Sequence, residues 1–248
     1  NNVEIPLRDP NDVEYPALRT QTPDGTGAAN LVDPYDADVP YRVSTPNGVK
    51  GVKSSLPPGH ERLSFNGTSD YVLVYQFDEF NPEGHITMEA WVYPTESKRQ
   101  DIISQKNGWV FFIESDNTVK LGEAQDPWDV VKTQDQIPLG EWTHIAVTNT
   151  DASNAGMTKF YINGNEATLD IDSNELWDDD HVELHDNDND AYIGCYDDWD
   201  RYFNGQIDEV RLWNTIRTQN QINSNKDTRL TGSESNLGHY FPMVGGSD

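Results

Sequence analysis

Short runs of alternating apolar and polar residues, separated by turns rich in Gly, Asn and Asp, follow one another from residue 61 onward. Alternation with a period of two is typical of β-strands, because successive side chains of a strand point to opposite faces. The runs predict strands at residues 63–65, 71–77, 85–94, 101–105, 108–114, 119–123, 142–149, 159–162, 191–194 and 209–213. A single helical turn is expected at residues 218–223. Many short strands at this spacing predict an all-β fold, a two-sheet antiparallel β-sandwich.

The N-terminal segment, residues 1–60, has a different composition, since it contains nine of the fourteen prolines. Proline lacks a backbone N–H and fixes φ, so this density excludes regular helices and central strands and favours extended or turn conformations. Edge strands are expected at residues 3–7, 41–44 and 49–54. We therefore divide the chain into a Pro-rich extended segment, residues 1–60, which wraps over the domain or links it to another, and one sandwich domain, residues 61–248.

The stretch 205–214, GQIDEVRLWN, is rich in β-branched and aromatic residues and predicts a central strand. Regular alternation places Asp208 on the same face as Val210 and Leu212. The opposite face then carries Ile207, Glu209, Arg211 and Trp213. A carboxylate beside an apolar layer needs a partner, because burying it alone costs several kcal/mol. Without a metal, Asp208 accepts hydrogen bonds from backbone N–H groups and Glu209 pairs with Arg211; the alternative is a bound metal ion.

The charge of the chain is strongly negative, with a formal net charge of −26 and an isoelectric point near 4.3. Sixteen Asp or Glu residues lie between residues 166 and 209, where Arg201 is the only Lys or Arg. Such a charge disfavours nucleic acid and anionic membranes as partners. Clustered carboxylates repel one another unless they are solvated, screened by salt or bound to a cation, and oxygen ligands of this kind suit Ca²⁺.

Cysteine content and targeting signals indicate the cellular compartment of a protein. Cys195 is the only cysteine, so no disulfide forms within the chain. No apolar run is long enough to span a bilayer, and no basic-then-apolar signal segment precedes the domain. The chain begins at Asn1 rather than Met, and we expect it to be a processed or excised part of a larger secreted, multidomain or oligomeric protein. The sequon Asn66-Gly67-Thr68 is interpreted first as a turn.

Seven segments occur in one order along residues 61–241. They are LSFNGTSDYVLV (63–74), ITMEAWVYP (86–94), GEWTHIAVT (140–148), KFYINGNEA (159–167), AYIGCY (191–196), GQIDEVRLWNTIRTQNQI (205–222) and RLTGSESNLGHYF (229–241). Together they resemble the LamG-like jelly-roll family, the concanavalin A-like sandwich found in lectins, pentraxins and modules of carbohydrate-active enzymes. The resemblance implies two antiparallel sheets packed face to face, with one concave surface edged by loops. It also implies a partner strand for residues 238–241 within the N-terminal segment 1–60.

The same resemblance implies a structural calcium ion. In such domains the ion is commonly held where the turn after the first motif strand meets the start of the IDEVR strand. Carried onto this sequence, the candidate ligands are Asn66, Asp70 and Asp208, completed by backbone carbonyl groups. Asn66 stands where the family often has Asp, which removes a charge and weakens the site, although an amide oxygen also ligates calcium.

A second calcium site is a weaker hypothesis. Asp186, Asp188 and Asp190 alternate as at the start of a calcium-binding loop. The sixth position of that loop needs Gly, whereas here it is Ala191, which already belongs to a predicted strand. A solvated acidic hairpin is therefore favoured over a second calcium site.

The histidines do not form a recognisable zinc motif. His181 and His185 are four residues apart but lack the Glu of the HExxH motif, so surface histidines are the favoured interpretation. His144, within a predicted strand, is interpreted as a structural residue.

The tryptophans separate into two groups. Those within the family motifs are expected to pack in the core or an interface: Trp91, Trp142 and Trp213. Those in acidic loops either bind sugar or cap the ends of the sandwich: Trp128, Trp177 and Trp199. An aromatic ring beside carboxylates is typical of a sugar-binding site, because the ring stacks on apolar C–H groups while the acids accept hydroxyl hydrogen bonds. The candidate ligand-binding residues are Trp199, Asp198, Tyr196 and Tyr202, followed by Trp177 and Trp128.

Catalytic motifs are weak in this sequence. Sandwich glycosidases often carry Glu-x-Asp-x-x-Glu on one strand, and the fragment Glu114-Ser115-Asp116 ends at Val119, where the third acid would stand. A lyase arrangement of Tyr202, His185 and Arg201 would face repulsion between the acidic loops and an anionic polymer.

The sequence therefore predicts a secreted or cell-surface, non-catalytic carbohydrate-binding module, stabilised by Ca²⁺, that binds a glycan or polysaccharide. The alternatives are a structural or adhesive module of a larger cell-surface or virion protein, and a polysaccharide-cleaving enzyme of jelly-roll fold. One fold hosts many functions, so the resemblance supports the architecture more strongly than the ligand.

Overall fold

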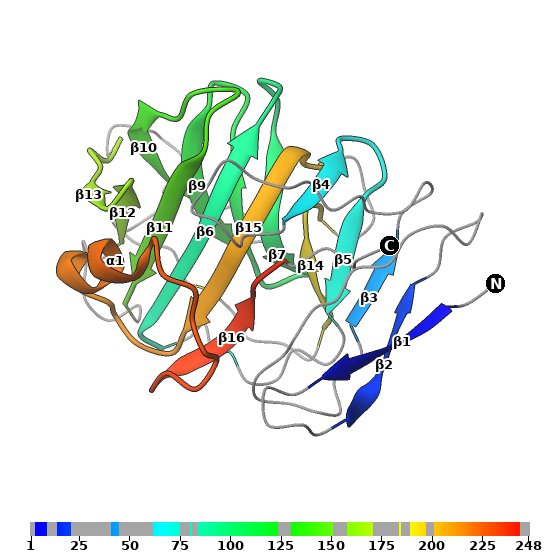
Figure 1. Ribbon diagram of the computed structural model, residues 1–248. Helices are drawn as coiled ribbons and strands as arrows, with labels where there is room; N and C mark the ends of the chain where they lie inside the picture. The colour runs from blue at the N-terminus through cyan, green and yellow to red at the C-terminus, as the bar shows by residue number, and fades with distance from the viewer. Residues whose placement is uncertain are drawn as a thin grey trace.

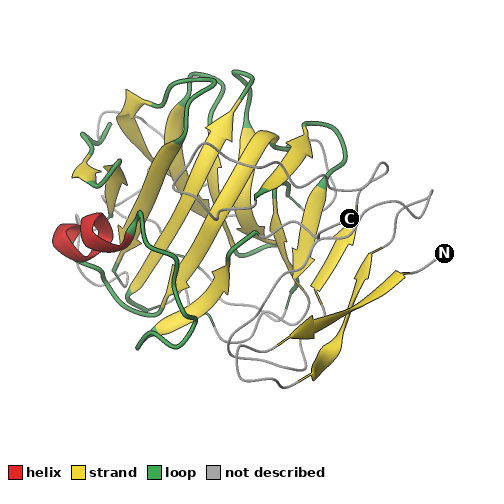
Figure 2. Cartoon of the chain, viewed as in Figure 1, coloured by secondary structure: helices red, strands yellow, loops and turns green. Residues whose placement is uncertain are grey.

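The computed structural model shows two stacked β-sheets with a short helix on the outer side of one of them (Figure 1; Figure 2). It describes residues 3–8, 14–20, 41–44, 62–74, 80, 84–123, 130–150, 158–170, 184, 189–196 and 201–243. Of residues 3–8, 14–20, 41–44 and 123 it describes the backbone only.

Seven strands form the first sheet, which we name sheet I. They lie in the order β10-β9-β8-β7-β14-β5-β3, and every neighbouring pair is antiparallel. Their bounds are β3 (Tyr41–Ser44), β5 (Tyr71–Val74), β7 (Gln100–Gln105), β8 (Trp109–Ile113), β9 (Thr118–Glu123), β10 (Val130–Gln136) and β14 (Ala191–Ile193).

The second sheet, sheet II, also has seven strands and is antiparallel throughout. Its order is β13-β12-β11-β6-β15-β16, and β4 pairs with the first part of β15. Their bounds are β4 (Leu63–Asn66), β6 (Ile86–Pro94), β11 (Thr143–Asn149), β12 (Lys159–Ile162), β13 (Asn165–Glu166), β15 (Asn204–Trp213) and β16 (Leu237–Phe241). This architecture confirms the predicted two-sheet antiparallel sandwich.

The main core lies between the sheets and is built by alternate residues of each strand. In β5, Val72 and Val74 are buried in the core, whereas Tyr71 and Leu73 lie on the other face and are half-buried. Each fully buried apolar side chain of this size contributes about 1.5–3 kcal/mol relative to an exposed one. The period-two pattern of the sequence therefore fixes which face of a strand becomes the interior.

The strands predicted in the N-terminal segment 1–60 are partly confirmed. β1 (Val3–Arg8) pairs with β2 (Glu14–Thr20) in a hairpin, and β3 is the edge strand of sheet I. The strand predicted at residues 49–54 lies outside the described residues. Three strands were not predicted: β2, which contains Pro16, β10, which ends in polar residues, and β13, which has only two residues.

A β-bulge interrupts β15. Relative to β6, the register shifts between Asp208 and Arg211, so two residues of β15 oppose one residue of β6. Glu209 lies in this bulge with a φ of 51°, a left-handed conformation that is uncommon for a residue other than glycine. Beyond the bulge, each side chain of β15 therefore points to the face opposite to the one that regular alternation predicts.

The bulge corrects the face assignment predicted for β15. Ile207 and Val210 both join the core together with Leu212. Asp208 pairs instead with Trp91 of β6, on the outer face of sheet II. The prediction that Asp208 shares a face with Val210 is wrong, because an inserted residue breaks the period of two.

The C-terminal strand, β16, pairs with the second half of β15. β16 pairs with Val210–Trp213 of β15, whereas β4 pairs only with Asn204–Ile207. β15 is long enough to bind two short strands one after the other along the same edge. Among the described residues, the partner of β16 is therefore β15; most of the N-terminal segment, where a partner was expected, lies outside those residues.

The predicted helical turn is confirmed as α1 (Gln219–Asn225). It begins with a capping box in which the Thr218 side chain accepts from the backbone N–H of Gln221 and the Gln221 side chain accepts from the backbone N–H of Thr218. Its buried Ile222 clusters with Ala146 and Tyr161 of sheet II. No helix among the described residues is long and apolar enough to cross a membrane.

Gly205, the second residue of β15, has no room for a side chain. An added Cβ would lie 2.0 Å from the carbonyl oxygen of Tyr93, and its φ is 140°. Gly140 also has a positive φ, 71°, but the nearest atom to its added Cβ, the Tyr93 hydroxyl oxygen, lies 3.7 Å away. We expect Gly205→Ala to lower the free energy of unfolding by at least about 2 kcal/mol more than Gly140→Ala in urea titrations. Equal losses of unfolding free energy in the two variants would show that the backbone at Gly205 and Tyr93 moves apart without a loss of stability.

Candidate functional site

Three half-buried tyrosines lie together on the outer face of sheet I, and we name them the tyrosine surface. Tyr71 of β5 lies between the other two, with ring centroids 5.9 Å from Tyr192 and 6.4 Å from Tyr202. Tyr192 belongs to β14, where its neighbours Ala191 and Ile193 are buried in the core. The side chains of Tyr71 and Tyr192 therefore point away from the interior, and all three tyrosines are half-buried residues.

The segment that carries Tyr202 is held by backbone hydrogen bonds. The N–H of Asp101 donates to the carbonyl of Arg201, and the N–H of Phe203 donates to the carbonyl of Gly194. Phe203 itself is buried in the core. The position of Tyr202 beside Tyr71 is therefore set by ordered backbone on both sides.

Tyr196 extends the aromatic region toward the turn between β7 and β8. The Arg201 guanidinium lies 5.1 Å from the centroid of its ring, and its hydroxyl accepts from the backbone N–H of Asn107 at 3.3 Å. Tyr196 and Tyr202, both predicted as ligand-binding residues, are thus each held by contacts with ordered residues. Trp128, Trp177, Asp198 and Trp199 lie outside the described residues, and their roles stay predictions.

Sequence reasoning missed Tyr71 and Tyr192 as site residues. Both lie in segments from which only the fold was predicted. A usable signal was present, since each tyrosine occupies the outward position of an alternating strand, YVLV and AYI. An aromatic residue at a solvent-facing strand position is less common in a monomeric surface than a polar one and indicates a contact surface.

The predicted calcium ligands Asn66 and Asp70 form a closed turn. Asn66 Oδ1 accepts from the backbone N–H groups of Thr68 and Ser69, both at 2.9 Å. Asp70 accepts from the backbone N–H and side-chain amide of Asn66, at 3.0 and 2.9 Å. Burial raises the pKa of Asp70 to about 6, against the hydrogen bond from Asn66. Each group of this turn is thus already engaged in hydrogen bonding.

Asp208, the third predicted ligand, lies elsewhere. Asn66 pairs with Asn204, and Asp208 lies four residues further along β15, about 13 Å at the usual strand rise. Its Oδ1 accepts from the backbone N–H of Glu209 at 2.8 Å. Burial, and then the charge of Glu209, raise the pKa of Asp208 to about 8.

The described residues therefore do not assemble the calcium site implied by the family. The structure brings Asn66 and Asp70 together and places Asp208 apart from them. In the part of the chain that the structure describes, no group of three or more His, Cys, Asp or Glu side chains is arranged to hold a metal. Calcium binding stays a prediction, and its ligands would have to include groups beyond this set.

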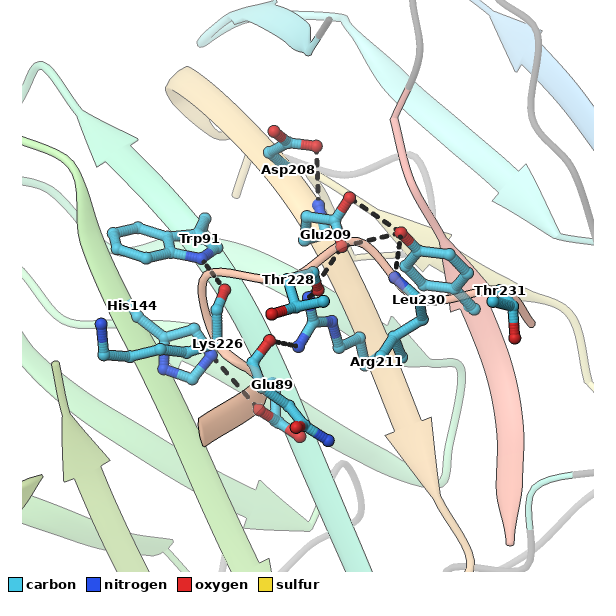
Figure 3. A network of polar contacts seen from close by, with 12 residues as sticks. Glu89, Trp91, His144, Asp208, Glu209, Arg211, Lys226, Thr228, Leu230 and Thr231 are labelled. Carbon is cyan, nitrogen blue, oxygen red and sulfur yellow. Dashed lines mark hydrogen bonds and ion pairs between the residues drawn. The ribbon is translucent and has the colours of Figure 1, made fainter. Parts of the chain in front are cut away.

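A buried ionic layer lies on part of the outer face of sheet II, over β6, β11 and β15 (Figure 3). Glu89 of β6 lies 3.3 Å from Nε2 of His144 and 3.4 Å from Nε of Arg217. Burial raises the pKa of Glu89, but His144, Arg211 and Arg217 outweigh it and leave the pKa below its ordinary value. Burial lowers the pKa of His144. The layer therefore favours an ionised Glu89 beside a neutral His144. His144 is a buried residue of β11 (Thr143–Asn149), as expected of a strand residue.

Arg211 and Tyr240 join this layer to the segment 214–236, which carries α1. Arg211 donates to Glu209 at 2.8 Å and to the carbonyls of Asn225 and Thr228 at 3.0 and 2.7 Å (Figure 3). The Tyr240 hydroxyl donates to Glu209 at 2.7 Å. The expected pairing of Glu209 with Arg211 is confirmed, and it fastens the segment to sheet II.

The acidic fragment after β8 is used for structure. Glu114 accepts from the backbone N–H of Ser115 and lies 3.4 Å from the ammonium group of Lys120. Asp116 accepts from the backbone N–H and hydroxyl of Thr118. Burial raises the pKa of both carboxyls, but these hydrogen bonds and nearby lysines leave each pKa below its ordinary value. A lowered pKa does not suit a general acid.

The comparisons with known proteins agree with this architecture. A family model described as the concanavalin A-like lectin/glucanases superfamily matches residues 66–223, more than half of the chain. No match was found among curated proteins.

Three solved structures of the same fold illustrate the likeness. A protein of Bacteroides ovatus ATCC 8483, described as a candidate carbohydrate-binding protein, is 19% identical, matches 87% of this chain and 50% of its own, and has a TM-score of 0.52. Domain 4 of AbnA, a GH43 extracellular arabinanase of Geobacillus stearothermophilus in complex with arabinotriose, is 19% identical, matches 75% of this chain and 87% of its own, and has a TM-score of 0.53. The binding domain of Paraclostridial Mosquitocidal Protein 1 is 14% identical, matches 90% of this chain and 51% of its own, and has a TM-score of 0.54. The chain thus spans about half the length of the first and third, and at these identities the likeness shows the fold alone.

Proposed function

Because this chain belongs to the concanavalin A-like lectin/glucanases superfamily, we propose that it is a non-catalytic carbohydrate-binding module whose ligand stacks on the tyrosine surface. The observation that carries this proposal is the cluster of three outward-facing rings, with centroids 5.9 and 6.4 Å apart across Tyr71. Aromatic rings stack on the apolar C–H face of a sugar, and phenol hydroxyls exchange hydrogen bonds with its hydroxyl groups.

The charge of the chain favours a neutral glycan. A net charge of −26 repels uronate or sulfate groups. Sixteen acidic residues lie between residues 166 and 209, the part of the sequence that carries Tyr192 and Tyr202. Carboxylates accept hydrogen bonds from neutral hydroxyl groups, so an acidic stretch of sequence suits an uncharged polysaccharide better than an anionic one.

The solved structures of the same fold support the ligand class. One is described as a candidate carbohydrate-binding protein, and another is a separate domain of an arabinanase bound to arabinotriose. The second match covers 87% of that domain, so the likeness concerns a whole module. We infer from this that the present chain, too, serves as a binding module within a larger secreted or cell-surface protein.

Binding to neutral oligosaccharides tests the proposal. We expect at least one of arabinohexaose, xylohexaose, cellohexaose and mannohexaose to bind the wild type in isothermal titration. Tyr192→Ala should weaken that binding at least tenfold, about 1.4 kcal/mol, because a stacking contact is lost. Tyr192→Phe keeps the ring and should bind within about threefold of the wild type.

Two results would contradict this assignment. Equal affinity of wild type and Tyr192→Ala would place the ligand elsewhere on the molecule. Failure of all four oligosaccharides to bind would instead favour the structural or adhesive module. Lys159→Ala, on the exposed pair with Glu166 in sheet II, serves as the matched control and should bind normally.

The absence of catalysis is part of the proposal. The engaged and low-pKa carboxyls of Glu114 and Asp116 support it. The corresponding four polysaccharides, incubated with the protein, should release no reducing ends or unsaturated products. If the activity that releases these products copurifies with the protein, the enzyme hypothesis is favoured.

A further inference from the structure

Three half-buried aromatic side chains lie on the outer face of sheet II, and we name them the tryptophan surface: Trp91, Tyr93 and Trp142. Trp91 and Tyr93 alternate in β6 with Ala90 and Val92, which are in the core. The ring centroid of Trp142 lies 5.6 Å from that of Tyr93. Sequence reasoning assigned Trp91 and Trp142 to core or interface packing, but neither belongs to the core.

The rings of this surface are held in fixed positions. The indole N–H of Trp91 donates to the carbonyl of Lys226 at 2.7 Å, and the His144 ring meets its edge at a centroid distance of 5.4 Å (Figure 3). The Arg62 guanidinium lies 4.8 Å from the centroid of Trp142. Aromatic side chains that are already ordered lose little entropy when a ligand stacks on them.

Cations and neutral polar groups both adjoin the rings, since the Lys226 ammonium lies 5.7 Å from the centroid of the Trp91 ring. Gln206 of β15 pairs across the sheet with Tyr93, and Ser64 of β4 pairs with Gln206. Gln206 Oε1 accepts no hydrogen bond among the described residues. This oxygen is buried. A ligand hydroxyl group would reach it only after the amide turned about its last torsion, which is a soft one.

The surface fits a sugar better than a protein partner. A stable protein interface buries about 800 Å² on each side around a fully apolar centre. Among the described residues, Leu139 is the only large hydrophobic side chain that is exposed. Ordered aromatic rings with an amide and a hydroxyl group beside them instead provide stacking and hydrogen bonding for a neutral sugar ring.

We propose that the tryptophan surface is a second binding surface for neutral glycans, so that the module binds two polysaccharide chains on opposite sides of its sandwich. The two outer faces are separated by both sheets, which lie about 10 Å apart, and by the side chains on each. No single short oligosaccharide spans that thickness, so the two surfaces bind separate chains and cross-link them. The cross-linking rests on the proposed function of the tyrosine surface, whereas binding at the tryptophan surface does not.

Stoichiometry in isothermal titration tests this proposal. With the four neutral hexaoses as probes, the wild type should bind two molecules of the recognised hexaose per chain. Tyr93→Ala with Trp142→Ala should bind one, as should Tyr71→Ala with Tyr192→Ala, and the lost site should be weakened at least tenfold. Tyr93→Phe with Trp142→Phe keeps the rings and should retain both sites. Thermal midpoints close to that of the wild type verify that each variant is folded.

The outcomes separate the two surfaces. If only the change at Tyr71 and Tyr192 abolishes binding, the second surface is disproved and the proposed function stands. If only the change at Tyr93 and Trp142 abolishes it, the tryptophan surface is the glycan site and the tyrosine assignment fails. If no hexaose binds the wild type, both proposals are overturned. With the corresponding polymer, the wild type should sediment as cross-linked complexes, and neither double variant should do so.

Discussion

Replacement of Arg211 by leucine is expected to lower the free energy of unfolding by about 3–5 kcal/mol in urea titrations, because breaking a buried ion pair leaves an uncompensated charge. Arg211 is fully buried and donates to Glu209. It also satisfies the carbonyls of Asn225 and Thr228, which anchor the segment 214–236. Its loss therefore leaves a buried carboxylate and two carbonyls with a missing donor.

The matched control is Lys159→Ala, because Lys159 forms an ion pair of similar length with Glu166 in the same sheet. The Nζ–Oε1 distance is 2.9 Å, but the two side chains are 47% and 48% exposed. Exposed pairs contribute about 0–1 kcal/mol, so this variant should be nearly as stable as the wild type. A loss below about 1 kcal/mol for Arg211→Leu would show that water enters the layer and solvates Glu209.

A double variant separates charge from packing. When Glu209→Gln is added to Arg211→Leu, the unpaired carboxylate disappears. The double variant should therefore lose less stability than the sum of the two single variants, by an interaction energy on the order of 1–3 kcal/mol. Strict additivity would indicate that Arg211 acts mainly through the backbone carbonyls that it binds.

Asp208→Asn is expected to remove a pH-dependent loss of stability between about pH 4 and pH 8. The pKa of Asp208 is raised from an ordinary value of 3.8 to about 8, so the folded state keeps a proton that the unfolded state has lost in this interval. The contribution of this group is fully present below pH 4 and decreases as the pH rises through 8. The slope is about 1.4 kcal/mol per pH unit, or on the order of 5 kcal/mol in total.

The measurement is the difference between the unfolding free energies of wild type and Asp208→Asn from pH 4 to pH 9. Asp70, whose pKa is raised to about 6, titrates with the same sign but is present in both proteins and cancels. The difference should favour the variant progressively as the pH rises. A flat difference would mean that Asp208 is ionised in the folded protein at neutral pH.

Asp208→Asn also tests the prediction of calcium binding. A cation bound at Asp208 would stabilise the ionised carboxylate, so excess Ca²⁺ at pH 8 should stabilise the wild type and not Asp208→Asn. A ligand at 100 times its dissociation constant adds about 2.7 kcal/mol, which is measurable as a higher thermal midpoint. Equal stabilisation of both proteins would place the ion elsewhere, and Asp70→Asn would then test the turn at Asn66. No effect on the wild type would refute the prediction of calcium binding.

Most of the fold was predictable because it depends on local pattern. Short runs of strand-forming residues predicted β5 and β6, and a helical turn was expected where α1 lies. These features rest on interactions between residues close in sequence. β10 was not predicted because Val130 and Val131 are its only apolar residues. A strand at the edge of a sheet can form with so few apolar residues.

The candidate site was predictable only in part. Tyr196 and Tyr202 were identified from their place beside acidic residues, whereas Tyr71 lies far earlier in the chain and meets Tyr202 only in the folded sheet. The family implied one calcium site from Asn66, Asp70 and Asp208. The pairing register separates them, because Asn66 lies opposite Asn204.

The sequence by itself determined the fold class, the acidic character and the strands that carry the aromatic residues, since these follow from composition and from the alternation of neighbouring residues. The tertiary structure alone decided which rings gather on each outer face and where the carboxylates point. The bulge at Glu209 turns Asp208 away from the core, and strand order places Tyr71 beside Tyr192. Register and strand order depend on contacts between residues far apart in the chain, and no local pattern encodes them.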